Sequence, residues 1–207
     1  PMPATTLHNL PTPTTSFVGR RRLLTELSTS LGRTRLLTLS GVGGVGKSRL
    51  ALELARLAGV STDFPDGVWL VELAGVQDPE VVASTVASAL RLTLPSGPPP
   101  TAALAEQLAS RALLLIMDNC EHLLDACSAL IDETLARCPE ITIVATSREP
   151  LALPGESVYR VPSLQLPSGT DLDIRELSRL EAVQLFVERV WLVSHSFRLN
   201  AKTAGPV

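Results

Sequence analysis

The chain has 207 residues, enough for one large domain or for one domain and part of another. Hydrophobic residues make up 45% of it and aromatic residues only 3%, which favours an α/β protein with a core of Leu, Val and Ala. The formal net charge of −3 argues against direct nucleic-acid contact by this segment. Apolar runs are too short to span a membrane and no signal peptide is visible, so we expect a cytoplasmic location.

Residues 1–40 precede the central motif of the sequence, which lies at residues 41–48. Residues 1–13 are rich in Pro and Thr and are predicted to form an extended lead-in. Residues 21–31 are predicted to form a helix, because their leucines recur at helical spacing. Judged by spacing alone, the basic residues 20–22 are exposed to solvent at the start of this helix. An apolar strand of residues 35–40 follows.

Residues 41–48 fit the spacing G-x-x-x-x-G-K-[ST] of a phosphate-binding P-loop. The apolar strand before the motif and the run of helix formers after it are the context that the motif requires. Glycines allow positive φ and close approach of phosphate oxygens to backbone N–H groups. Lys47 is predicted to contact the β- and γ-phosphates, and Ser48 to bind Mg²⁺. The predicted phosphate-binding residues are Gly41, Val42, Gly43, Gly44, Val45, Gly46, Lys47, Ser48 and Arg49.

Strands and helices are predicted to alternate through the rest of the domain. The predicted strands are residues 35–40, 68–73, 112–119, 141–146 and 157–161. After the P-loop helix (49–58), the predicted helices are residues 78–90, 101–110 and 120–137. We expect Asp78 and Thr101 to cap the first residues of their helices.

Two strand ends carry candidate site residues. The third predicted strand is apolar throughout, as a parallel strand covered on both faces should be, and it ends in Asp118. After a P-loop, this is the position of the Walker B acid that holds Mg²⁺ through water; the alternative is an Asp that caps the next helix. The fourth strand leads to Arg148, a candidate γ-phosphate sensor, because ligands bind at the carboxyl ends of such strands.

Three cysteines, Cys120, Cys127 and Cys138, are too few for a disulfide framework and show no zinc-site spacing. We expect buried thiols in a reducing cytosol.

The last predicted helix covers residues 179–193. It resembles the first helix of a second, helical domain that the chain is too short to complete, so we expect a fragment of a longer protein. The predicted organisation is a lead-in (1–13), a P-loop nucleotide-binding domain (14–168), and a linker with the first part of a helical domain (169–207).

Several motifs occur together in a fixed order. They are Phe17-Val18-Gly19-Arg20, the P-loop, the strand to Asn119 with Cys120-Glu121-His122, the run 145–151, the run 155–161 and the helix segment 181–187. Together they resemble the NB-ARC-like nucleotide-binding domain of STAND ATPases. The resemblance is strongest to actinomycete-type bacterial transcriptional regulators, SARP-like or large LuxR-like.

This resemblance implies a P-loop NTPase fold with a five-stranded parallel sheet, order 5-1-4-3-2, flanked by helices. It implies that Phe17, Val18 and Gly19 lie on the adenine side of ATP or ADP. It also implies that Arg20 buttresses this segment or the phosphates, and that Arg148 is sensor 1. Family members are switches in which ADP holds a closed monomer and ATP permits a homo-oligomer. Their partners are other domains of the same chain, including a DNA-binding domain.

The sequence departs from the pattern after Asp118. Many P-loop ATPases have a second acid there as the base that activates water, whereas this chain has Asn119. Glu121 is the nearby candidate base. The predicted catalytic set is therefore Lys47, Asp118, Arg148 and Glu121, with slow or partner-dependent hydrolysis.

Two other functions remain open. A stand-alone P-loop enzyme, such as a GTPase or a small-molecule kinase, is disfavoured because the chain has no N-K-x-D-like guanine reader and no evident substrate lid. A non-hydrolysing nucleotide-binding scaffold is compatible with Asn119.

Overall fold

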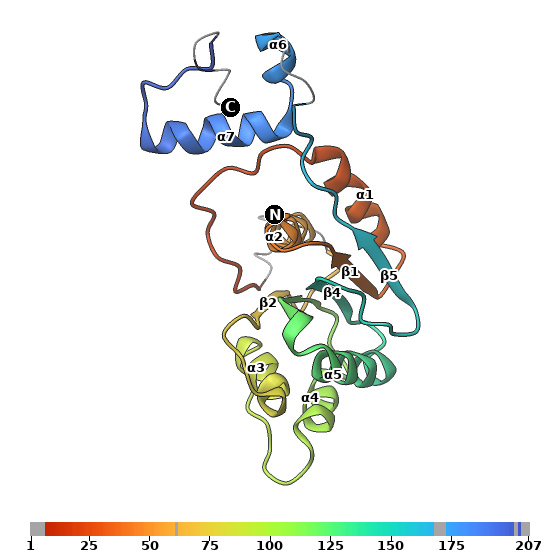
Figure 1. The fold of residues 1–207 in the computed structure, drawn as a ribbon. Helices are drawn as coiled ribbons and strands as arrows, with labels where there is room; N and C mark the ends of the chain where they lie inside the picture. Colours follow the sequence, from red (N-terminus) through yellow and green to blue (C-terminus); the bar gives the residue numbers. More distant parts are fainter. Residues whose placement is uncertain (1–6, 61, 168–172, 201–202, 204–207) are drawn as a thin grey trace, which may run out of the picture. The chain divides into compact units, whose positions relative to one another are not determined.

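The computed structural model describes residues 7–60, 62–167, 173–200 and 203. The chain divides into two compact units (Figure 1). Of the described residues, the first unit contains 7–12 and those between 24 and 161. The second unit contains 13–23 and those from 162 onward. Residues 1–6 of the predicted lead-in and 169–172 of the predicted linker lie outside the described residues.

The first unit is built on a five-stranded parallel sheet (Figure 1). Its strands are β1 (Leu36–Ser40), β2 (Val68–Glu72), β3 (Leu114–Asp118), β4 (Thr142–Ser147) and β5 (Glu156–Arg160). Their order is β2-β3-β4-β1-β5, and every neighbouring pair is parallel. This is the predicted order 5-1-4-3-2 read from the opposite edge, so the predicted fold class is confirmed.

Helices cover the sheet and bury its apolar side chains. Helix α2 (Lys47–Ala58) contacts β1, β3 and β4, and its residues Leu50 and Leu54 are fully buried. Helices α3 (Val82–Ala89), α4 (Pro100–Leu108) and α5 (Leu124–Arg137) share one core cluster with alternate residues of the strands. Alternate strand residues point to opposite faces, so the strands are covered on both sides. Helix α1 (Arg21–Leu31) has the predicted bounds.

Two predicted helix starts are corrected by the structure. Thr101 does not cap a helix, because α4 already begins at Pro100, whose missing N–H and fixed φ suit the first helical position. The predicted helix 120–137 is interrupted. A 3₁₀ turn, η2 (Cys120–His122), comes first, Leu123 leaves the helical region with φ −129°, and α5 begins at Leu124.

The segment before α3 follows the prediction more closely. A 3₁₀ turn, η1 (Pro79–Val81), precedes the helix, and the Asp78 side chain accepts the Glu80 N–H at 2.9 Å. The predicted cap at Asp78 is confirmed.

Residues 7–9 lie along the outer edge of β2. The Leu7 carbonyl accepts the Val68 N–H at 2.9 Å. The Asn9 side chain accepts the Leu70 N–H at 2.6 Å and donates to the Leu70 carbonyl at 2.8 Å. This segment therefore satisfies backbone groups of an edge strand that would otherwise be open to another chain.

The second unit contains α6 (Ile174–Leu177) and α7 (Glu181–Val193). The predicted last helix is thus present and begins two residues later than expected. Val183 is buried, whereas Phe186, Trp191 and Val193 are exposed. Phe186 packs edge to face against Phe197, with 6.1 Å between ring centroids. That this unit is the first part of a helical domain stays a prediction.

We expect Asn9→Ala to lower the free energy of unfolding by about 1–3 kcal/mol, because it removes two hydrogen bonds to a strand. Urea unfolding of the 207-residue chain measures this change. His8→Ala, at an exposed neighbouring position, is the control. Equal stability of the two variants would contradict an edge-covering role for Asn9.

Candidate functional site

Residues 41–48 connect the end of β1 to the start of α2 with a backbone shaped for an anion. Gly44 and Gly46 have φ of 77° and 93°, in the left-handed region that favours glycine. Gly46 is the N-cap of α2 and has no side chain that could accept the first N–H groups of the helix. Backbone N–H groups and the positive end of the helix dipole therefore meet at this loop.

Lys47, the first residue of α2, is held inside the loop. Its side chain is buried, and Nζ donates to the carbonyl oxygens of Gly41 at 2.8 Å and Val42 at 3.2 Å. An ammonium group has three N–H donors, so one remains for a phosphate oxygen. The loop thus fixes a positive charge next to its own backbone N–H groups.

Asp118 stands at the end of β3 and is tied to the neighbouring strand. The hydroxyl of Thr146, fully buried in β4, donates to Asp118 Oδ1 at 2.5 Å. The same hydroxyl oxygen accepts the Asn119 N–H at 3.0 Å. These two bonds orient the carboxylate and leave its second oxygen as an acceptor.

Parallel pairing brings these groups to one edge of the sheet. Ser40, the last residue of β1, is paired with Ser147 at the end of β4, and β4 lies beside β3. The P-loop and Asp118 therefore follow strands that end at the same carboxyl edge.

The donor set fits magnesium held jointly with phosphate. Ser48 offers a hydroxyl and Asp118 a carboxylate, and Mg²⁺ prefers such oxygen ligands together with phosphates and water. Among the described residues, no group of three or more His, Cys, Asp or Glu could hold a metal alone. A metal here would therefore depend on a bound phosphate.

Arg148 and Glu121 form an ion pair near the loop. Arg148 Nε lies 3.3 Å from Glu121 Oε1. The Arg148 side chain is 69% exposed and that of Glu121 only 16%, and Glu121 Oε2 is buried without a hydrogen-bond partner. A Cβ on Gly43 would lie 3.8 Å from Arg148 Nη2, so the guanidinium reaches the P-loop.

A cavity of about 670 Å³ opens beside the loop. It is lined by Ser40, Gly41, Val42, Gly43, Arg148, Glu149, Pro150, Val158 and Arg160. Two of these residues, Arg148 and Arg160, place guanidinium groups around it from the ends of β4 and β5. This positive charge favours an anionic ligand.

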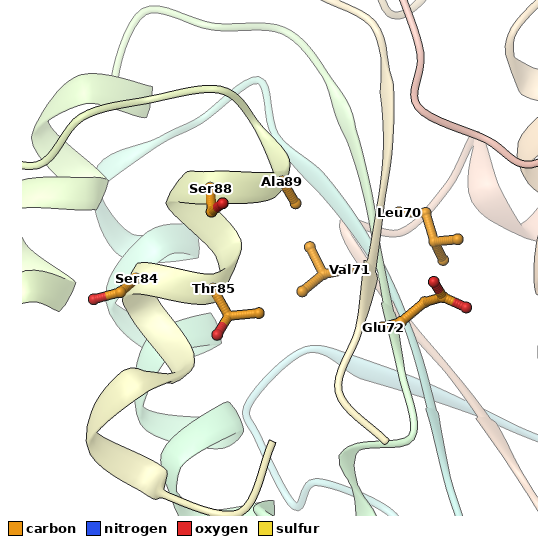
Figure 2. Close-up of a pocket in the computed structure, with 7 residues that line it drawn as sticks. All are labelled: Leu70, Val71, Glu72, Ser84, Thr85, Ser88 and Ala89. Atoms are coloured by element: carbon orange, nitrogen blue, oxygen red, sulfur yellow. The ribbon is translucent and has the colours of Figure 1, made fainter. Parts of the chain in front are cut away.

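Another hollow, of about 480 Å³, lies between β2 and α3 and has a different character. Figure 2 shows Ser84, Thr85 and Ser88 on α3, with Val71 pointing toward the helix and Glu72 pointing away from it. The lining contains a carboxylate and no basic side chain. This hollow is therefore a poor site for a phosphate.

The cysteines are buried free thiols, as predicted. A hydrogen bond with Cys127, together with burial and the nearby charges of Asp118 and Glu121, raises the pKa of Cys120 well above its usual value. Cys120 therefore stays protonated at neutral pH and serves as packing beneath the Asp118 strand end.

The structure brings most of the predicted site residues into the first unit. Residues 41–49, Asp118, Glu121 and Arg148 all belong to it, and Arg49 pairs with Glu53 at 3.1 Å. Phe17, Val18, Gly19 and Arg20 belong to the second unit, and their part in the site stays a prediction.

Sequence reasoning missed Thr146 and Arg160. Both could have been found, because the predicted strand order already placed their strands beside those of Asp118 and the P-loop. The signal is that residues near the carboxyl ends of neighbouring parallel strands lie close together.

Residues 30–153, which contain the whole P-loop and the Asp118 and Arg148 positions, match the AAA domain family AAA_22. The chain belongs to this family of AAA domains. AAA domains with a P-loop generally bind nucleotide with Mg²⁺.

Curated relatives of this AAA domain are found in actinobacteria. An uncharacterized protein of Mycobacterium tuberculosis is 40% identical over 193 residues, which are 93% of this chain and 46% of that protein. A "Putative HTH-type transcriptional regulator" of the same species is 41% identical over 180 residues, 86% of this chain and 19% of that protein. Regulatory protein AfsR of Streptomyces griseus is 31% identical, over 87% of this chain and 18% of that protein. The chain thus spans about half or less of these relatives.

Among solved structures, the AAA domain is similar to a STAND protein with a tetratricopeptide repeat sensor from Pyrococcus horikoshii. The TM-score is 0.55 at 17% identity, over 97% of this chain and 29% of that chain, so the likeness concerns the fold. With the family match and the regulator relatives, it confirms the predicted resemblance to a P-loop domain of bacterial regulators.

Every helix in the described part of this AAA domain is too short or too polar to cross a bilayer.

We expect Thr146→Val to raise the Mg²⁺ concentration needed for nucleotide binding by roughly tenfold, since it removes a charge-assisted hydrogen bond that orients Asp118. Thr146→Ser should restore the wild-type requirement, because it keeps the hydroxyl. Magnesium titration with a fluorescent ADP analogue measures both. An unchanged magnesium requirement in Thr146→Val would remove Thr146 from the site.

Proposed function

We propose that this chain is the ATP- and ADP-binding switch domain of a signal-transduction or transcription regulator. In this proposal, nucleotide exchange and slow ATP hydrolysis control opening and oligomerisation. One observation carries it: the P-loop with Lys47 stands at the same sheet edge as the Asp118–Thr146 pair. The relatives, which include AfsR and a putative HTH-type transcriptional regulator, support the regulatory role.

The nucleotide phosphates are the ligand that the P-loop fits. The N–H groups of residues 42–49 and the third donor of Lys47 bind phosphate oxygens, while Arg148 and Arg160 add positive charge from the cavity wall. Ser48, and Asp118 through water, would hold Mg²⁺, which would neutralise phosphate charge.

Hydrolysis is slow in this proposal because no side chain is available as the base that activates water. Asn119 cannot accept a proton, and Glu121 has one oxygen held by Arg148 and the other buried. The γ-phosphate of ATP is a competing anion for Arg148, whose side chain is largely exposed. A move of Arg148 to the γ-phosphate releases Glu121, so the base becomes available only when a triphosphate is present.

Adenine recognition is assigned to residues 17–20 by resemblance. The chain lacks the N-K-x-D run that reads guanine in GTPases. We therefore propose ATP and ADP rather than GTP as the ligands.

The wider partners follow from the relatives, which are much longer than this chain. We propose that the domain acts on other domains of one longer cytoplasmic chain and forms a homo-oligomer when ATP is bound. DNA contact belongs to another part of that chain.

A second candidate, a nucleotide-binding scaffold without hydrolysis, is favoured by Asn119. A measurement of ATP hydrolysis distinguishes the switch domain from the scaffold.

Nucleotide binding is tested with matched glycine variants. Gly44 and Gly155 have φ of 77° and 76°, and a Cβ at either position meets no atom within 4 Å. Both Ala variants therefore carry the same backbone strain, but only Gly44→Ala adds a methyl group to the phosphate loop.

We expect Gly44→Ala and Lys47→Ala to weaken ATP and ADP binding by roughly tenfold or more, because charge-assisted contacts with the phosphates are lost. Gly155→Ala should bind both nucleotides as wild type does. Calorimetric titration measures this. Equal binding by Gly44→Ala and Gly155→Ala would refute the phosphate assignment, and preference for GTP would refute the adenine assignment.

For the base, we expect Glu121→Gln to bind ATP at least as tightly as wild type, because it removes the anion that competes for Arg148. It should hydrolyse ATP at least roughly tenfold more slowly, because an amide cannot take the proton. Single-turnover ATP hydrolysis is the measurement. Glu133→Gln, on α5 and paired with Arg137 at 3.2 Å, is the control. Wild-type turnover by Glu121→Gln would rule out Glu121 as the base.

A further inference from the structure

Residues 16–20 adopt a backbone that requires support from outside the segment. Gly19 and Arg20 both have positive φ, 70° and 55°. A left-handed conformation is unfavourable for a long side chain such as that of Arg20. Such strain persists where neighbouring groups hold the backbone in place.

Glu181, the first residue of α7, supplies that support within the second unit. Its Oε1 accepts the Arg20 N–H at 2.6 Å. Its side chain also fills the space next to Gly19, because a Cβ on Gly19 would lie 2.6 Å from Glu181 Cδ and 2.9 Å from Cγ. Glycine is therefore required at position 19 both by its φ and by the carboxylate packed against it.

A second acid of α7 holds the other end of the segment. The Ser16 hydroxyl donates to Glu188 Oε1. Glu181 and Glu188 are seven residues apart and so lie on the same face of the helix. One helix face thus binds both ends of residues 16–20 and leaves Phe17 and Val18 between the two contacts.

The Arg20 side chain adds a third contact. Its Nη2 donates to the Pro162 carbonyl at 2.8 Å. Burial lowers the pKa of Arg20, and the charge of Glu181 acts in the opposite direction. The guanidinium is thus directed to the chain that leads into α6 and α7.

We propose that Glu181 and Glu188 form an acidic clamp through which α7 sets the conformation of the adenine-side segment, with Glu181 as its main positioning residue. This inference rests on the proposed function, which gives residues 17–20 their contact with the base. Its consequence is a direct coupling. When α7 withdraws, the Arg20 N–H loses its acceptor and the base-binding backbone loses its support. When nucleotide leaves, the segment holds α7 less firmly.

The test separates base binding from phosphate binding. ATP carries both adenine and a triphosphate, whereas inorganic triphosphate offers phosphates alone. We expect Glu181→Ala to weaken ATP binding by roughly tenfold, the effect of losing a charge-assisted hydrogen bond, and to leave triphosphate binding unchanged. Glu181→Gln, which keeps an acceptor oxygen, should lose less. Glu176→Gln on α6 of the same unit is the control.

A double-mutant cycle gives a readout that general destabilisation would not produce. Gly19→Ala places a methyl group against Glu181, so its loss of ATP affinity should shrink when Glu181 is also changed to Ala. Three outcomes would overturn the proposed clamp. They are additive losses of ATP affinity in the cycle, wild-type ATP affinity in Glu181→Ala, and an equal loss of affinity for ATP and for triphosphate. If Gly44→Ala binds ATP as well as wild type does, the proposed function itself fails.

Discussion

The hydrogen bond from Thr146 to Asp118 joins two neighbouring parallel strands at the edge where the P-loop begins. It depends on the register of β3, β4 and β1, which pairs Met117 with Ala145 and Ser40 with Ser147. The apolar side chains that set this register are buried by helices on both faces of the sheet. The site is thus a consequence of the core: shifting one strand by a residue would turn its side chains to the other face and separate these groups.

In two charged contacts, an acid holds a group that our proposals assign to nucleotide recognition. Glu121 holds Arg148 in the first unit, and Glu181 holds the backbone of Arg20 in the second. Both acids are partly buried. In our proposals, both contacts respond to nucleotide, which suits a switch better than a rapid hydrolase.

Much of this architecture could be predicted from the sequence, because its signals are local. The P-loop has fixed residue spacing, and apolar runs of strand length alternate with helix formers. The strand order came from the resemblance and agrees with the structure. The break after Asp118 could not be predicted in this way. It depends on the left-handed Asn119, at φ 69°, and on a hydrogen bond between the His122 ring and the distant Val76 carbonyl. The contact of Glu181 with Arg20 spans 161 residues and leaves no local pattern.

The most direct test of the central claim is the nucleotide content of the purified 207-residue chain, measured by mass spectrometry and followed by calorimetric titration with ATP and ADP in magnesium. The account predicts saturable binding of an adenine nucleotide at about one molecule per chain, as a single P-loop allows. A well-folded chain that carries no nucleotide and binds neither ATP nor ADP would contradict it.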